Sequence, residues 1–119
     1  GLWQSTCFEL FICGVGGAYR ELNFSPSSQW AAYEFERYRE GRRDLSLESP
    51  PQISSDDEDL DGRWFLTSLD DRDAPPGARF GVSAVIEETD GTKSYWALAH
   101  PPGDRPDFHH PDCFAAILP

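Results

Sequence analysis

The dipeptide Asp90-Gly91 most constrains the fold of this chain, because it separates two runs that alternate between apolar and polar residues. These runs are Arg79–Thr89 and Lys93–Ala99. An Asp-Gly pair readily adopts the positive φ angles of a tight two-residue turn, so the pattern predicts a β-hairpin. The chain is therefore expected to bury its apolar residues in antiparallel β-structure.

The same alternation recurs between short stretches of Gly, Pro, Ser and Asp. We expect further strands at Thr6–Cys13, Ala18–Phe24, Gln29–Phe35, Arg63–Leu69 and Phe114–Leu118. The glycine-rich link 14–17 should join the first two as a hairpin. The charged stretch Glu36–Asp44 has room for one helical turn, and the prolines within Leu45–Ser55 limit it to a short or edge strand. The sequence thus predicts one all-β domain, residues 1–119, folded as an antiparallel β-sandwich.

The charge balance bears on the class of function. The chain has 21 acidic and 10 basic residues and a net charge of −11, which would repel a phosphate backbone, so nucleic-acid binding is not expected. No apolar run approaches the roughly 18 residues of a membrane span, and no membrane partner is expected.

The chain begins without Met and is interpreted as a fragment. Its cysteines lack zinc-type spacing and indicate buried thiols, which favours a cytoplasmic location with export left open.

A polar face provides the candidate binding residues. Glu21 and Asn23 alternate with Leu22 and Phe24, so one face of that strand should be polar, as a ligand-binding or a solvated face would be, and the other buried. Glu9 interrupts an apolar run in the preceding strand. A hairpin register that sets Glu9 on the side of Glu21 would bring two carboxylates together. Such groups, with an amide, can orient sugar hydroxyls by hydrogen bonding.

Aromatic residues complete this interpretation, because their rings suit the apolar faces of pyranoses. The candidate stacking surfaces are Trp3, Trp30, Tyr33 and Trp96. The alternative is that these rings are core, and that the acids are solvated or paired with Arg20 or Arg39.

Three motifs add a resemblance to a known family. Trp3 precedes Cys7-Phe8-Glu9-Leu10-Phe11, the segment 19–26 reads YRELNFSP, and 108–114 reads FHHPDCF. In this order they resemble the DOMON-like β-sandwich domains, which are related to family 9 carbohydrate-binding modules. The resemblance implies a jelly-roll-like sandwich that here lacks its first one or two strands. It also implies non-catalytic binding of a sugar or of haem. The expected ligand-binding residues are Trp3, Glu9, Glu21, Asn23, Trp96 and His109.

Carbohydrate or another small polar ligand is the first hypothesis, with no cofactor, and haem is the alternative. The chain has no Met, so axial ligands would come from His100, His109 and His110. His109 and His110 are adjacent, so their side chains would point in opposite directions on an extended backbone. A structural or interaction domain without a small ligand is the third hypothesis, and the oligomeric state is left open.

Metal sites and catalysis are weaker hypotheses. The run 57–62 matches the first half of an EF-hand loop, but Ser68 stands at the twelfth position, so a solvated acidic loop is favoured. Asp107, His109, His110 and Cys113 could gather around zinc, although a packed structural loop is favoured. Two carboxylates can serve a glycosidase, yet no other catalytic motif accompanies them, so the protein is expected not to be an enzyme and to hold no metal.

Overall fold

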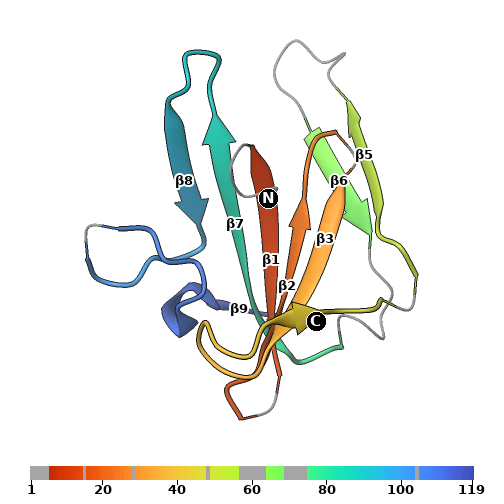
Figure 1. Ribbon diagram of the computed structural model, residues 1–119, viewed down its shortest axis with the longest axis vertical. Helices are drawn as coiled ribbons and strands as arrows, with labels where there is room; N and C mark the ends of the chain where they lie inside the picture. The colour runs from red at the N-terminus through yellow and green to blue at the C-terminus, as the bar shows by residue number, and fades with distance from the viewer. Residues whose placement is uncertain are drawn as a thin grey trace.

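The computed structural model describes residues 6–14, 16–27, 29–47, 49–56, 64–68, 75–103 and 105–119 (Figure 1). Among these residues the strands are β1 (Cys7–Cys13), β2 (Tyr19–Phe24), β3 (Trp30–Phe35), β4 (Arg43–Asp44), β5 (Gln52–Asp56), β6 (Trp64–Ser68), β7 (Arg79–Glu87), β8 (Lys93–Ala97) and β9 (Ala116–Ile117). A short 3-10 turn, η2 (Pro111–Cys113), precedes β9. Every strand pairing is antiparallel. The predicted antiparallel all-β class is therefore confirmed.

The main sheet has the order β4-β3-β2-β1-β7-β8, and β9 pairs with β7. Figure 1 shows these strands fanning out from β8 to β3, with β5 and β6 forming a separate two-stranded ribbon near the β3 side. The centre of the main sheet is the β1–β7 pairing, in which Cys7 lies opposite Val85 and Ile12 opposite Phe80. The prediction of a two-sheet sandwich goes beyond these pairings and stays a prediction.

The hairpin predicted at Asp90-Gly91 forms, but residues 88–92 join its strands in place of a two-residue turn, and only Gly91 among them has a positive φ. Gly91 has a φ of 88°, and the backbone N–H of Glu88 donates to the Thr92 carbonyl at 2.8 Å. The Asp90 carboxylate accepts a further hydrogen bond from the Thr92 N–H at 2.8 Å. The turn thus closes the β7–β8 hairpin and sets Val85 opposite Tyr95.

The stretch Glu36–Asp44 differs from the expected helical turn. Arg37 and Glu40 form a β-bridge, and the chain reverses through Arg39 and Gly41, with φ of 53° and 70°. A positive φ is incompatible with a right-handed helix, so the segment folds back and pairs with β3 as β4. By contrast, the proline-limited segment behaves as predicted, because β5 begins only at Gln52 and pairs with β6.

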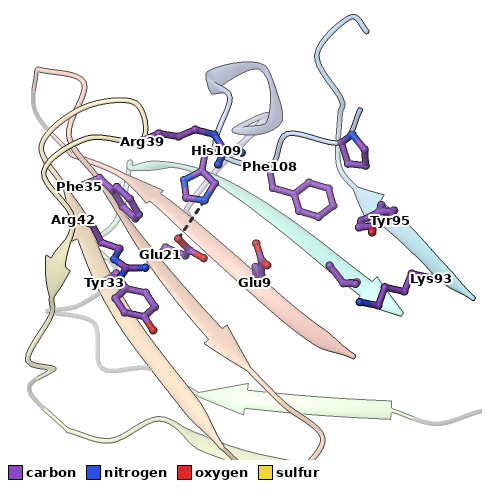
Figure 2. Close-up of a pocket in the computed structure, with 12 residues that line it drawn as sticks. Glu9, Glu21, Tyr33, Phe35, Arg39, Arg42, Lys93, Tyr95, Phe108 and His109 are labelled. Carbon is purple, nitrogen blue, oxygen red and sulfur yellow. Dashed lines mark ion pairs between the residues drawn. The ribbon is translucent and has the colours of Figure 1, made fainter. Parts of the chain in front are cut away.

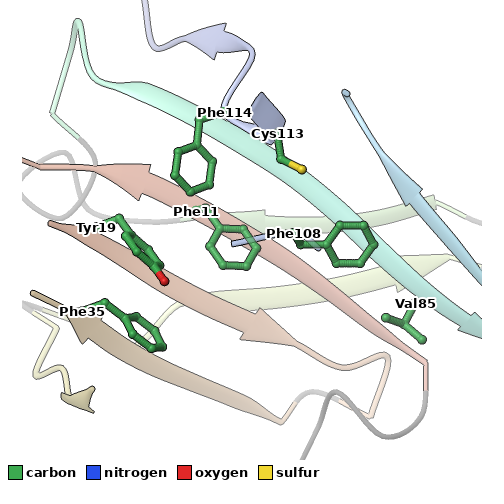
Figure 3. Packing of buried hydrophobic residues seen from close by; sticks show 7 residues of the cluster. All are labelled: Phe11, Tyr19, Phe35, Val85, Phe108, Cys113 and Phe114. Atoms are coloured by element: carbon green, nitrogen blue, oxygen red, sulfur yellow. The ribbon is translucent and has the colours of Figure 1, made fainter. Parts of the chain in front are cut away.

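Apolar residues pack on both faces of the main sheet. One face carries a cluster of Ile12, Leu22, Phe24 and Ala32, against which Leu45, Leu47 and Ile53 pack. The other face carries a cluster of Phe11, Tyr19, Phe35, Val85, Phe108, Cys113 and Phe114 (Figure 3). The second face is the one that holds Glu21, and the alternative interpretation of it as a solvated face is wrong, because Glu9 and Glu21 are buried. The C-terminal segment 108–114 covers it and removes the carboxylate from water.

A glycine allows this covering segment to lie close to the sheet. A Cβ atom on Gly81 would lie 2.6 Å from the carbonyl oxygen of Cys113 and 3.1 Å from the ring of Phe114. Side-chain atoms at that position would push the C-terminal segment away from β7. Gly81 therefore sets the height of the segment over the sheet.

Candidate functional site

A cavity of about 690 Å³ lies on the sheet face that holds Glu9 and Glu21 (Figure 2). Strands β1 and β2 form its floor, and β3 with the following loop, β8 and the C-terminal segment form its walls. The lining residues are Glu9, Glu21, Tyr33, Phe35, Arg39, Arg42, Val85, Lys93, Tyr95, Pro106, Phe108 and His109. The cavity therefore combines acidic, aromatic and cationic side chains in one place.

The strand register brings the two carboxylates together. Glu9 lies opposite Asn23 and Phe11 lies opposite Glu21, and residues paired across antiparallel strands share a face. Glu9 and Glu21 are consequently diagonal neighbours, and each exposes only 6% of its surface. Their placement side by side agrees with the sequence prediction. Their part in binding a ligand stays a prediction.

Burial perturbs both acids. It raises the pKa of Glu9 to about 7, with a further contribution from the charge of Glu21, while a hydrogen bond from the Ser83 hydroxyl at 3.4 Å opposes the rise. Burial also raises the pKa of Glu21, which the Asn23 amide and the positive charge of Arg42 partly oppose. Near neutral pH the floor therefore offers, at Glu9, a carboxyl group that readily takes up or releases a proton.

A chain of hydrogen bonds orients the imidazole above this floor. The Arg39 backbone N–H donates to the Tyr19 hydroxyl oxygen at 3.0 Å, so the hydroxyl proton is free to donate to His109 Nδ1, 2.7 Å away. The remaining ring proton is then on Nε2, which lies 3.4 Å from a Glu21 carboxylate oxygen. The dashed line in Figure 2 marks this contact.

Burial keeps this imidazole uncharged. It lowers the pKa of His109 to about 4, and the positive charge of Arg39 adds to the effect. The ring is also packed edge-on against Phe11 and Phe35, with centroid distances of 5.0 and 5.1 Å. His109 thus presents a neutral N–H to Glu21 at pH 7.

Cations and aromatic rings meet along the walls of the cavity. The Arg42 guanidinium lies 5.1 Å from the centre of the Tyr33 ring. The Arg39 guanidinium pairs with Asp107 at 2.7 Å, and the Tyr38 hydroxyl also donates to that carboxylate. These contacts hold both arginines beside the cavity, so cations line its walls whereas its floor is acidic.

One predicted site residue lies on the wrong face. Trp96 is 64% exposed and lies opposite Ala84, on the side of the sheet away from Glu9. Its neighbour Tyr95 faces the cavity instead, because successive side chains of a strand point to opposite faces. The weaker candidate Trp30 also lies on the far face, paired with Phe24.

The other candidates have mixed outcomes. His109 lies in the cavity lining, as does Tyr33, which was a weaker aromatic candidate. Asn23 lies on the same face but is fully buried, and its amide atoms have no hydrogen-bond partner of normal geometry among the described residues. Trp3 lies outside the described residues.

The proposed pairing partners of the acids are also placed elsewhere. Arg20 is on the opposite face, since it pairs with Ile12, and Arg39 forms its ion pair with Asp107. The acids are buried and not solvated.

Sequence reasoning missed Arg42, Lys93, Tyr95 and Phe108. The hairpin turn alone places Lys93 and Tyr95 on one face of β8, and this could have been read from the alternation. The pairing of β7 with β1, in which Ser83 lies opposite Glu9, determines whether these two side chains lie on the same face as Glu9. No local pattern carries that information.

The residues considered for zinc make other contacts. The Cys113 thiol lies 3.2 Å from the Asp107 carbonyl oxygen, and His110 Nδ1 accepts the backbone N–H of Asp112 at 3.1 Å as the cap of η2. Within the described part of the chain, no three His, Cys, Asp or Glu side chains are grouped to hold a metal ion. The acidic run 57–62 lies outside the described residues.

The fold and the cavity together define a class, that of an antiparallel all-β chain with a polar and aromatic cavity on one sheet face. No protein-family model, curated protein or solved structure matches this chain. In the described ranges, no helix is long and apolar enough to cross a membrane.

Proposed function

We propose that this protein is a non-catalytic module that binds a carbohydrate or another small polar ligand in the cavity over β1 and β2. One observation carries the proposal, namely that two buried carboxylates, Glu9 and Glu21, face a cavity with aromatic walls. Its volume of about 690 Å³ is in the usual range for small-molecule sites. Burying two acids is costly for a fold, so a ligand that uses them is a reason for their presence.

The side chains around the cavity suit a hydroxyl-rich ring. Tyr33, Phe35, Tyr95 and Phe108 provide aromatic surface for the apolar faces of a sugar. The carboxyl groups on the floor can accept or donate hydrogen bonds to hydroxyls. The resemblance to DOMON-like domains supports the same proposal, since residues from its first two motifs lie on this floor.

Haem binding is the less favoured hypothesis for this cavity. His109 is the histidine that lines it, and its ring nitrogens already face the Tyr19 hydroxyl and the Glu21 carboxylate. An axial bond to iron would require one of these contacts to break. A polar organic ligand needs no such change.

A matched pair of variants tests the proposal. We expect Tyr95→Ala to weaken the binding of a responsive sugar by about tenfold, the effect of losing one aromatic contact. Trp96→Ala, one residue further along β8, should leave the affinity unchanged because its side chain lies on the other face. Titration calorimetry with a panel of monosaccharides and disaccharides would measure both effects.

Amide chemical shifts should report the same site, with changes concentrated in β1, β2 and β8. Trp30 and Trp96 lie on the far face, so their fluorescence is not expected to report binding in the cavity. The proposal is wrong if no sugar in the panel binds, or if Trp96→Ala weakens binding as much as Tyr95→Ala.

A further inference from the structure

In the described part of the chain, neither arginine that lines the cavity forms an ion pair with the two acids on its floor. Both Glu9 and Glu21 are buried, yet the arginines that line the cavity contact other groups. Arg39 pairs with Asp107, and Arg42 lies over the ring of Tyr33.

Among the described residues, Ser83 and His109 bring neutral donors to these acids, and both donors are distant. Ser83 Oγ lies 3.4 Å from a Glu9 oxygen, and His109 Nε2 lies 3.4 Å from a Glu21 oxygen. Both separations are at the long limit for a hydrogen bond, and an ionised carboxylate can accept about four. The acids therefore retain acceptor capacity, and it faces the cavity (Figure 2).

We infer that the ligand of this cavity is an amino sugar with a free, protonated amine, and that the carboxylates of Glu9 and Glu21 bind its N–H groups. This inference rests on the proposed binding of carbohydrate in the same cavity. An ammonium group has three N–H donors and a positive charge, so it can satisfy two neighbouring carboxylates at once. It also offsets the cost of holding both acids away from water.

The cations that line the cavity limit the chemical groups that the rest of the ligand can carry. Arg39, Arg42 and Lys93 bring positive charge to the lining, so a second ammonium group there would be repelled. Hydroxyl oxygens are acceptors for the same N–H donors, and the aromatic walls fit the apolar face of a sugar ring. A single amine on a hydroxyl-rich ring suits both the acidic floor and the cationic, aromatic walls of the cavity. A polyamine suits only the floor.

The test compares each amino sugar with two close analogues. Glucosamine, galactosamine and mannosamine would be titrated by calorimetry at a pH where their amines are protonated, beside their N-acetyl forms and the parent hexoses. We expect at least one amine to bind roughly ten- to hundredfold more tightly than its acetylated and hydroxyl analogues, the range for hydrogen bonds between charged groups.

Glu9→Gln and Glu21→Gln should each reduce this preference at least about fivefold, since the amide keeps the shape but loses the charge. Glu88→Gln, in the exposed β7–β8 turn, makes the same chemical change away from the cavity and should leave the preference intact. Urea unfolding of the variants would show that they are folded.

The outcomes separate the inference from the proposed function. If hexoses or N-acetyl forms bind as tightly as the amines, the amine inference is overturned while carbohydrate binding stands. The same holds if both Gln variants keep the full preference. If none of these sugars nor any other in the panel binds, both are overturned.

Discussion

Replacing Glu9 by Gln should stabilise the protein at alkaline pH and have little effect near pH 4.5. Burial raises the pKa of Glu9 from 4.5 to about 7, so the folded state holds this proton more tightly than the unfolded state. The stability linked to it is present below pH 4.5 and is lost as the pH rises to about 7. The full loss is about 3 kcal/mol, since one pKa unit is worth about 1.4 kcal/mol.

The uncharged Gln side chain resembles the protonated acid at every pH. The free energy of unfolding of Glu9→Gln should therefore exceed that of the wild type by up to about 3 kcal/mol at pH 8, and by almost nothing at pH 4.5. Urea unfolding at a series of pH values measures this difference, and an increase of this size would move the midpoint by about 1 to 3 M.

The difference between variant and wild type is the informative quantity, because His109 acts in the opposite direction. Its pKa is lowered from 6.5 to about 4, so the folded state loses stability as the pH falls through that interval. The two effects partly cancel in the wild type. Glu88→Gln makes the same chemical change at an exposed position and is the matched control. A gap between Glu9→Gln and the wild type that stays constant from pH 4.5 to 8 would refute the reasoning.

Further predictions concern the segment that covers the sheet. His109→Gln should remove the contribution of His109 to the loss of stability between pH 6.5 and 4, which is up to about 3 kcal/mol, as followed by urea unfolding. Tyr19→Phe should cost about 1 to 3 kcal/mol by the same assay, because the Arg39 N–H and His109 Nδ1 lose their shared partner. Gly81→Ala should cost about 1 to 3 kcal/mol, since its methyl group would meet the Cys113 carbonyl, and thermal unfolding would show it.

Each of these predictions has a contradicting result. An unchanged acid dependence in His109→Gln would mean that the imidazole is not held neutral by the fold. A neutral effect of Tyr19→Phe would mean that the hydroxyl does not bridge the two partners. A Gly81→Ala variant as stable as the wild type would mean that the C-terminal segment shifts without cost.

Local alternation of residues was sufficient to predict most of the strands. The hairpin at Asp90-Gly91 and the strand boundaries of β1, β2 and β3 differ from the prediction by at most a residue or two, because turn chemistry and the pleat act between near neighbours. The placement of Glu9 beside Glu21 follows from the same local rules, since one short link joins their strands.

Features set by distant residues were not predictable in this way. The position of Trp96 on the far face was not predictable, because the face of β8 is fixed by a pairing between β7 and β1, far apart in the sequence. The burial of the acidic face depends on the C-terminal segment. The sequence near Glu21 does not predict that this segment covers the face. The expected helical turn in 36–44 was wrong because Arg39 adopts a left-handed conformation that is uncommon for its residue type.

The covering segment also determines when the site can exist during protein synthesis. The hydrogen bond between Tyr19 and His109 joins residues 90 positions apart. The floor of the cavity therefore leaves the ribosome long before the segment that covers it, and Phe11 and Tyr19 have no cover during that interval. Contacts over such separations are slow to form and leave apolar surface open to aggregation. The complete cavity and the cover over its apolar floor thus form in the same late step of folding.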